Sequence, residues 1–542
     1  MPTMNREEFV AFCEEHRASG RVLVVPLGVS LLSDQLTPVL AYRRLVSADE
    51  RTAPSFLLES VEGGERVGRH SVLGARPMLE VIATGDEVTL IDHRDESRSQ
   101  RHGEDPFEIL RSIAHERVLV VPQEAVARGL LPSCVLGGWF GYAAYDSVRY
   151  AEPEKLGFAD APTDDRNLPD LHFGFYDGVV VFDHIAKRLH VVKMVEIADG
   201  VDAGRAHDEA MAALEQRVAD LGRHSKPLPL GRVDRDRPSS VMASNLTREG
   251  HAEMVSRALE YIRAGDIFQV VLGQRFERVS QADPFDVYRA LRAVNPSPYM
   301  VYLQAAGCIL VASSPEILCR VRRSGAGFVV TNRPLAGTRR RGATEAEDRS
   351  LEVELLADPK ERAEHVMLVD LGRNDVGRVA EPGSIRLERV MDVERYSHVM
   401  HISSTVTGVL REGLDAWDAL RAALPVGTIS GAPKIRAMQI IDELEPVRRG
   451  PYGGGLGWVS LDGEMDIALA LRTMVVPTDM RCADGAWVYH IQAAGGIVAD
   501  SQAEPEFMET VNKAAAMGRA IDLAEHAFGG RRLTSDGGPA SA

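Results

Sequence analysis

The sequence predicts an α+β fold whose sheet is largely antiparallel. Apolar residues recur at the i, i+3, i+4 and i+7 spacing of a helix face over 255–262, just before Gly265. Near the other end, the strand-like stretches 456–461 and 464–476 flank Asp462-Gly463, a pair typical of a tight hairpin turn. Helices and strands alternate without the regular order of a doubly wound fold, which favours antiparallel pairing.

The chain divides into two structured portions, which we expect at 22–221 and 245–522. Further strand-like stretches lie at 118–121, 135–142, 178–183 and 267–276. The connector at 222–244 carries three prolines among charged residues and serines, which indicates a linker. The last residues, 528–542, are rich in glycine, serine and alanine, and we expect a flexible tail there.

Charge and composition narrow the class of protein. The 62 Lys and Arg residues stand against 79 Asp and Glu residues, a net charge of −17, which argues against nucleic-acid or anionic-membrane partners. Apolar residues make up 45% of the 542 residues and charged residues 26%, as in a globular protein with ample material for a core. The apolar stretch at 22–32 is broken by Pro26 and Gly28 and is too short to span a bilayer.

The cysteines and the N-terminus predict the compartment. The five cysteines are odd in number and show no Cys-x-x-Cys spacing, which fits a reducing environment. The first residues also lack the basic-then-apolar layout of a signal peptide. We therefore expect a cytoplasmic protein with neither a membrane nor a nucleic acid as its partner.

Two short segments each place a Glu-x-x-Glu just after a proline. The first carries Glu361 and Glu364, and the second carries Glu506 and Glu509. A proline suits the first turn of a helix, so each pair of carboxylates would share one helix face. Carboxylates that meet from two helices would suit a hard cation, Mg²⁺ above all. A solvated helix face is the alternative, because chance alone produces about 11 acidic pairs at this spacing in such a chain.

Two further side chains have both a functional and a structural interpretation. His401 lies in a strand-like run at 399–403, where a buried, hydrogen-bonded histidine is the alternative to a catalytic one. Arg472 ends a strand-like run in which its same-face neighbours, Ala468 and Ala470, leave space for an anion. An ion pair with an internal carboxylate is the alternative for this arginine.

A series of motifs, in the same order along the chain, resembles those of the chorismate-utilising enzymes. The motifs lie at 264–272, 313–316, 333–339, 358–364, 368–372, 399–401, 427–434 and 496–501. Within that family the chain is similar to the component I branch of the anthranilate synthases, over about 29–522. The resemblance implies an α+β fold of two packed antiparallel β-sheets surrounded by helices, with the active site between the sheets.

The resemblance also assigns a metal to the acidic helices. It implies that Glu364 and Glu509 ligate Mg²⁺ directly, with Glu361 and Glu506 behind ordered waters, and that the ion holds the ring carboxylate of chorismate. The implied catalytic residues are Glu316, His401, Thr428 and Gln269. The implied chorismate contacts are Gly337, Thr338, Tyr452, Arg472, Ala494, Gly495, Gly496 and Lys513.

The implied reaction adds nitrogen to the ring. Glu316 would protonate the departing C4 hydroxyl of chorismate, which requires surroundings that raise the pKa of its carboxyl group. His401 would then remove the C2 proton as the ring becomes aromatic and pyruvate leaves. Gln269 stands where the isochorismate and salicylate branches have a lysine that deprotonates water. Glutamine cannot act as that base, whereas ammonia has a free lone pair, so ammonia is the expected nucleophile.

The expected product is anthranilate, formed in the first step of tryptophan biosynthesis. Ala336 stands where many aminodeoxychorismate synthases have a lysine that attacks the ring, and alanine favours direct amination at C2. An aminodeoxychorismate synthase component I is the close alternative. A non-catalytic regulator that binds tryptophan or chorismate is a third interpretation, against which Glu316, His401 and the four helix glutamates speak.

The resemblance also implies partners and an inhibitor. None of the five cysteines has the context of a glutaminase nucleophile, so we expect a glutamine amidotransferase subunit, component II, that supplies ammonia within a heteromeric complex. Two segments resemble those that bind L-tryptophan in feedback-inhibited members, although as bare sequence they are a strand end and a proline-rich turn. The implied inhibitor contacts are Glu59, Ser60, Asn295, Pro296, Pro298, Tyr299 and Met300.

Overall fold

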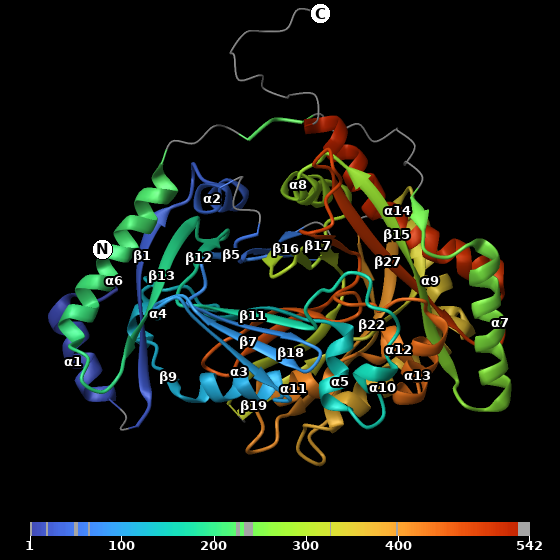
Figure 1. Cartoon of the computed structure of the whole chain (residues 1–542), viewed down its shortest axis with the longest axis horizontal. Helices are drawn as coiled ribbons and strands as arrows, with labels where there is room; N and C mark the ends of the chain where they lie inside the picture. The colour runs from blue at the N-terminus through green and yellow to red at the C-terminus, as the bar shows by residue number, and fades with distance from the viewer. Residues whose placement is uncertain are drawn as a thin grey trace, which may run out of the picture.

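Two large β-sheets pack against each other and are flanked by helices (Figure 1). The structure is a computed structural model, and it describes residues 3–17, 20–47, 52–62, 66–223, 228–231, 242–325, 327–396 and 399–528. Pairing within the sheets is antiparallel almost throughout, with a parallel pair at β1 (Val22–Leu32) and β9 (Arg117–Leu119). The predicted α+β fold with two packed antiparallel sheets is confirmed.

Within the described residues, the first sheet has thirteen strands. In order across the sheet they are β14 (Ala243–Ser244), β15 (Gln269–Ser280), β27 (Trp487–Ile497), β26 (Thr473–Pro477), β17 (Cys308–Ser314), β16 (Tyr299–Ala305), β2 (Ser55–Glu59), β5 (His70–Ala75), β12 (Val180–Asp183), β13 (Arg188–Ile197), β1 and β9. The short strand β23 (Gly431–Ala432) pairs with β15 outside this order.

The second sheet has twelve strands in the part of the chain that the structure describes. In order they are β20 (Leu335–Arg340), β22 (Val399–Val409), β19 (Gly327–Asn332), β18 (Ile317–Ser324), β25 (Met465–Leu469), β24 (Gly455–Val459), β10 (Gly138–Ala143), β11 (Leu171–Tyr176), β6 (Leu79–Thr84), β7 (Glu87–Asp92) and β8 (Ser97–His102), while β21 (Arg386–Arg395) pairs with β22. A separate ribbon consists of β3 (Val61–Glu62) and β4 (Arg66–Val67).

The helices lie outside the two sheets (Figure 1). They are α1 (Arg6–His16), α2 (Pro38–Leu45), α3 (Pro106–His115), α4 (Gln123–Ala127), α5 (Val148–Ala151), α6 (Ala203–Gly222), α7 (Arg248–Ala264), α8 (Pro284–Val294), α9 (Glu345–Ala357), α10 (Pro359–Gly377), α11 (Ala416–Ala423), α12 (Gly427–Ser430), α13 (Lys434–Leu444) and α14 (Ala503–Phe528), with 3₁₀ turns at Tyr145–Ser147 and Phe158–Asp160. Within the described residues, none of these helices combines the length and the apolar character needed to cross a membrane.

Local signals explain where the predicted helix α7 begins and ends. The Thr247 side chain accepts a hydrogen bond from the Gly250 N–H and caps the first turn. Gly265 ends the helix with a φ of 83°, a left-handed conformation that glycine adopts without steric cost. The helix predicted before Gly265 is therefore confirmed.

Each sheet takes strands from both predicted portions of the chain. In the first sheet β16 pairs with β2, and in the second β24 pairs with β10. The sheets share an apolar core, in which Phe56 stacks on Phe140 with the ring centroids 4.0 Å apart. The two portions thus build one pair of sheets, and anything bound between the sheets contacts both.

The segments predicted as linker and tail are only partly described. Helix α6 continues to Gly222 and β14 begins at Ala243, whereas residues 224–227 and 232–241 of the predicted linker lie outside the described residues. Helix α14 ends at Phe528, and residues 529–542 of the predicted tail also lie outside them. Both assignments stay predictions.

The strand predicted at 464–476 is wrong as a continuous element. Strand β25 ends at Leu469 in the second sheet, and β26 begins at Thr473 in the first. Arg472 lies in the crossover between them with a φ of 46°, so it does not share a strand face with Ala468 and Ala470. Apolar alternation continues across the crossover, and for that reason periodicity could not reveal it.

Candidate active site

One cavity of about 770 Å³ lies between the sheets and the helices α10, α12 and α14, a size typical of small-molecule sites. Its lining includes all predicted metal ligands, all predicted catalytic residues, and every predicted chorismate contact except Gly495. Gly495 instead turns toward the acidic helices, since a Cβ there would lie 3.2 Å from Glu506 Oε2. Of the predicted inhibitor contacts, Asn295 and Pro296 line this cavity.

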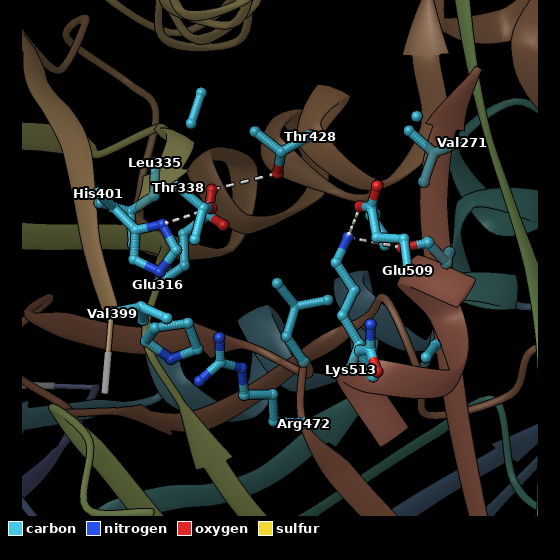
Figure 2. A pocket seen from close by; sticks show the side chains of 18 of the residues that line it. Val271, Glu316, Leu335, Thr338, Val399, His401, Thr428, Arg472, Glu509 and Lys513 are labelled. Carbon is cyan, nitrogen blue, oxygen red and sulfur yellow. Dashed lines mark hydrogen bonds and ion pairs between the residues drawn. The ribbon is translucent and has the colours of Figure 1, made fainter. Parts of the chain in front are cut away.

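Glu316 is a buried carboxyl group at the start of β18, and only 4% of its surface is exposed. Thr428 Oγ1 donates a hydrogen bond to Glu316 Oε1 over 3.1 Å (Figure 2). Burial raises the pKa of Glu316 to about 8, and this outweighs the lowering effect of the hydrogen bonds from Thr428 and from the Leu335 backbone. At neutral pH the group therefore carries a proton that it can donate into the cavity.

His401 is a neutral imidazole on β22. Its Nδ1 lies 3.0 Å from the Gly337 carbonyl oxygen and 3.1 Å from Thr338 Oγ1. A carbonyl oxygen only accepts, so Nδ1 carries the hydrogen and Nε2 keeps a free lone pair. Burial, together with the positive charge of Arg472, lowers the pKa of His401 to about 4. The ring can therefore accept a proton at Nε2.

A bulge in β20 sets the orientation of that histidine. The pairing of β20 with β22 shifts register between Ala336 and Thr338, and Gly337 between them has a φ of 67°. This conformation turns the Gly337 carbonyl toward His401. A Cβ at Gly337 would also lie 3.1 Å from Glu361 Oε2, so glycine suits the position on both counts.

Arg472 supplies positive charge to the cavity. Burial lowers the pKa of its guanidinium, and among the described residues no carboxylate forms an ion pair with it. The internal ion pair considered from the sequence is therefore not present. A cation in such surroundings, without a protein counter-charge, suits a bound anion such as a carboxylate.

The two acidic segments lie at the beginnings of α10 and α14, as predicted. Burial raises the pKa of Glu364, and the charges of Glu361 and Glu509 raise it further. Burial also raises the pKa of Glu506, again with a contribution from Glu509. Carboxylates from the two helices therefore influence one another across the cavity.

Carboxylate oxygens are the ligands that Mg²⁺ prefers, and Glu506 Oε2 is buried without a hydrogen-bond partner among the described residues. Two of the four glutamates already have a cationic partner: Glu361 pairs with Arg339 over 3.1 Å, and Glu509 pairs with Lys513 over 2.6 Å. In the present side-chain conformations, the described residues contain no group of three His, Cys, Asp or Glu side chains close enough together to bind one metal ion. The donor set fits Mg²⁺ in chemistry, and side-chain adjustment would be needed to complete it.

The remaining predicted residues complete the walls of the cavity. Gln269 lies opposite Gly496, where a Cβ would come within 2.5 Å of Gln269 Nε2, and its Oε1 has no partner in the described part of the chain. The Tyr452 hydroxyl accepts a hydrogen bond from the Ala494 backbone. Lys513 Nζ donates to the Ala494 carbonyl oxygen over 2.9 Å. These contacts bring β15, β27 and α14 together.

Arg449, which was not predicted from the sequence, holds two residues of the cavity wall. This buried guanidinium donates to the carbonyl oxygens of Ile429 and Val271, each over 2.7 Å, and pairs with Glu445 over 2.6 Å. It thereby fixes the backbone beside Thr428 and Gln269. Its one local partner is Glu445, four residues earlier, and the two carbonyl groups that it binds come from distant segments, so no local pattern marks it.

The predicted inhibitor segments meet next to the cavity. Glu59 at the end of β2 pairs in register with Met300 of β16, and Ser60 follows Glu59. The Glu59 carboxylate accepts a hydrogen bond from Tyr288 over 2.6 Å and pairs with Arg292 over 2.9 Å. The Tyr299 hydroxyl donates to Asp466, and Pro298 immediately precedes β16.

Known proteins resemble this chain over nearly its whole length. It matches the chorismate binding enzyme family over residues 53–519. It is 54% identical over 522 residues to the chloroplastic anthranilate synthase alpha subunit 1 of Oryza sativa subsp. indica, with 93% of this chain and 89% of the relative covered. It is 45% identical to anthranilate synthase component 1 of Pseudomonas putida, with 96% and 99% covered.

A solved structure agrees with these relatives. Anthranilate synthase component I from Streptococcus pneumoniae TIGR4 superposes with a TM-score of 0.70 at 34% identity, and the match covers 90% of this chain and 99% of that one.

We expect the stability of the protein to fall with rising pH relative to a Glu316→Gln variant. Burial raises the pKa of Glu316 from 4.5 to about 8, so the folded state keeps a proton that the unfolded state releases. The stabilising contribution is complete below pH 4.5 and is lost as the pH rises through about 8, with a slope of up to about 1.4 kcal/mol per pH unit. Urea unfolding of both proteins across this window measures the difference, and an identical pH dependence would contradict a protonated Glu316.

Proposed function

The chain belongs to the chorismate binding enzyme family, and we propose that it is the synthase subunit that makes anthranilate and pyruvate from chorismate and ammonia. One observation carries this function: Glu316 and His401 line the same cavity, where burial raises the pKa of the carboxyl group to about 8 and lowers the pKa of the imidazole to about 4. Loss of a hydroxyl group followed by removal of a ring proton requires one donor and one acceptor of protons.

Glu316 and His401 act in successive steps. The lone pair of ammonia forms a bond to C2, the ring double bonds shift, the C4–O bond breaks, and the new ammonium nitrogen releases one proton to solvent. Glu316 gives its proton to the leaving hydroxyl group, which departs as water. His401 Nε2 then takes the C2 proton, the electrons of that C–H bond complete the aromatic ring, and the C3–O bond breaks. The expelled enolate takes up a proton and becomes pyruvate.

Two positions of the cavity, 269 and 336, bear on which nucleophile attacks the ring. Gln269 cannot deprotonate water, but its unpartnered Oε1 can accept a hydrogen bond from ammonia. Ala336 lines the cavity with a methyl group, which cannot attack the ring. Both features favour direct amination at C2 over formation of isochorismate or aminodeoxychorismate.

Chorismate carries two carboxylates, and the cavity offers a separate place for each. Arg472, together with Tyr452 and the backbone near Ala494, would hold the carboxylate of the enolpyruvyl arm. The ring carboxylate would lie toward Glu364 and Glu509. Mg²⁺ held by the four glutamates would supply the positive charge that this carboxylate needs.

The function predicts that the purified chain, given chorismate, Mg²⁺ and ammonium chloride above neutral pH, produces the fluorescence of anthranilate. Glu316→Gln should lower kcat at least about 100-fold, because it removes the proton donor. Glu80→Gln is the matched control, since Glu80 is equally buried in the second sheet but lies outside the cavity. A 4-amino product would point to an aminodeoxychorismate synthase, and chorismate binding without turnover would point to a regulator.

A separate subunit would release the ammonia from glutamine. All five cysteines are free thiols. Burial raises the pKa of Cys13 to about 11 and the pKa of Cys134 and Cys308 to about 12, so these thiols are not poised as nucleophiles. We therefore propose a glutamine amidotransferase partner in a heteromeric complex. A cytoplasmic location also stays a prediction.

A test of metal dependence distinguishes a Mg²⁺ site at the four glutamates from a solvated helix face. Glu509→Ala should abolish both the heat of Mg²⁺ binding in calorimetry and the formation of anthranilate, because it removes a proposed direct ligand. Glu504→Ala is the matched control, since Glu504 lies one turn earlier on α14, is exposed and pairs with Arg248. Unchanged Mg²⁺ binding by the Glu509 variant would remove this glutamate from the metal site.

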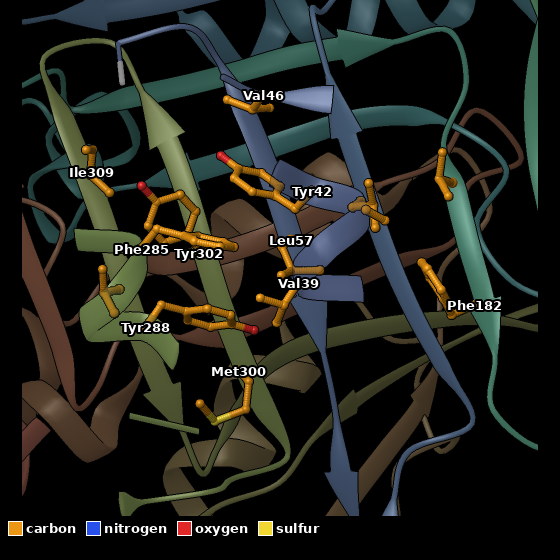
Figure 3. Close-up of a cluster of buried hydrophobic side chains, with 14 of the residues drawn as sticks. Val39, Tyr42, Val46, Leu57, Phe182, Phe285, Tyr288, Met300, Tyr302 and Ile309 are labelled. Carbon is orange, nitrogen blue, oxygen red and sulfur yellow. The ribbon is translucent and has the colours of Figure 1, made fainter. Parts of the chain in front are cut away.

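The position of α8 supports feedback inhibition by L-tryptophan, because this helix contacts Glu59 and ends beside the cavity. Phe285, Tyr288 and Tyr302 pack together and anchor α8 to the first sheet (Figure 3). The same helix contacts Glu59 through Tyr288 and Arg292, and the residue after its end, Asn295, lines the cavity. A ligand bound at Glu59 would therefore act on the cavity through a single packed helix, and chorismate would have to weaken tryptophan binding by the same factor.

We expect Glu59→Gln to raise the concentration of L-tryptophan needed for half-inhibition at least about tenfold, because a charged partner for the tryptophan ammonium group is lost. The KM for chorismate should stay unchanged. Glu196→Gln is the control, since it also breaks arginine pairs in the first sheet but far from α8. Initial rates of anthranilate formation measure both constants, and equal sensitivity of the two variants would refute a tryptophan site at Glu59.

A further inference from the structure

The position of the Arg472 guanidinium depends on an unusual backbone conformation. Its φ of 46° falls in the left-handed region, which costs free energy for any residue with a Cβ. The residue also lies in the crossover between β25 and β26, where neither sheet continues a ladder through it. Such a conformation persists only where neighbouring groups hold it.

A four-residue segment, Ser313 to Glu316, holds both ends of this crossover. The Ser313 N–H donates to the Arg472 carbonyl oxygen over 3.1 Å, one residue beyond the pairing of β17 with β26. At the other end, Ser314 Oγ donates to the Leu469 carbonyl oxygen over 2.5 Å, and the Leu469 N–H donates to the Glu316 carbonyl oxygen over 3.0 Å. The segment that carries the proton donor therefore also sets the backbone of the arginine.

Ser313 is in turn fixed by Asn295. The Ser313 hydroxyl donates to the Asn295 carbonyl oxygen over 2.5 Å and accepts from Asn295 Nδ2 over 3.1 Å. Ser313 is fully buried, and Asn295 is 7% exposed at the end of α8. Two hydrogen bonds between the same two residues leave Ser313 little freedom to shift.

We propose that Ser313, held by Asn295, is a positioning residue that fixes the Arg472 backbone so that the guanidinium enters the cavity. This inference rests on the proposed function, in which Arg472 binds the carboxylate of the enolpyruvyl arm. Ser313 does not line the cavity, so its effect on chorismate must pass through Arg472 or Asn295. Loss of its hydroxyl group frees Asn295 and loosens the backbone hydrogen bond from β17 to the arginine carbonyl.

The first test is a steady-state comparison on the full chain with Mg²⁺ and ammonium chloride. Ser313→Ala should raise the KM for chorismate about tenfold and change kcat by less than about twofold, because binding and not proton transfer is affected. Ser55→Ala is the matched control, since Ser55 is also fully buried in the first sheet and bonds to Tyr42 and Ala53. Both variants should lose similar thermal stability, and an unchanged KM in Ser313→Ala overturns the proposal.

The second test is a double-mutant cycle with Arg472→Gln. Calorimetry without ammonia gives the dissociation constant of chorismate for the wild type, the two single variants and the double variant. Ser313→Ala should weaken binding in the wild type but not in the Arg472→Gln background, whereas equal weakening in both overturns the proposal. If the four proteins bind chorismate with this pattern but the wild type makes no anthranilate, the proposed function is wrong, whereas the positioning role of Ser313 still holds.

Discussion

Burial of Glu316 and His401 between the two sheets is the constraint on which the site depends. Burial raises the pKa of Glu316 and lowers the pKa of His401, so one physical cause favours a protonated carboxyl group and a neutral imidazole in the same cavity. In water the carboxyl group would be ionised at neutral pH and the imidazole would be partly charged. Core contacts such as that of Phe56 with Phe140 pack the two sheets together and so help to keep these side chains buried.

Regular strands and helices form the walls of the cavity, whereas irregular backbone segments orient the side chains that are proposed to react. The bulge at Gly337 turns a carbonyl toward His401, and the left-handed crossover directs Arg472 inward. Glu316, the proposed proton donor, lies between β17 and β18 rather than within a strand. Departures from ideal geometry at these points are held by buried hydrogen bonds, such as those of Ser313 and Arg449.

Features with a local signal were predictable, and features made by distant segments were not. Helix α7, the acidic turns of α10 and α14 and the turn at Asp462-Gly463 follow from spacing, capping and turn residues. The family motifs added the residues of the cavity. The crossover at Arg472 was missed because its apolar alternation matches that of an unbroken strand. The pairing of Glu59 with Met300 joins residues 241 positions apart, and no local pattern encodes such a contact.

The balance of charge around the acidic helices explains why a divalent cation suits them. Arg339 offsets Glu361, and Lys513 offsets Glu509. Glu364 and Glu506 have no ion-pair partner among the described residues, and both have a raised pKa because burial and neighbouring carboxylates oppose their ionisation. Two uncompensated carboxyl groups beside a place for an anionic substrate would repel that substrate once ionised. Two positive charges between the helices would offset both of them, and the substrate carboxylate could then approach.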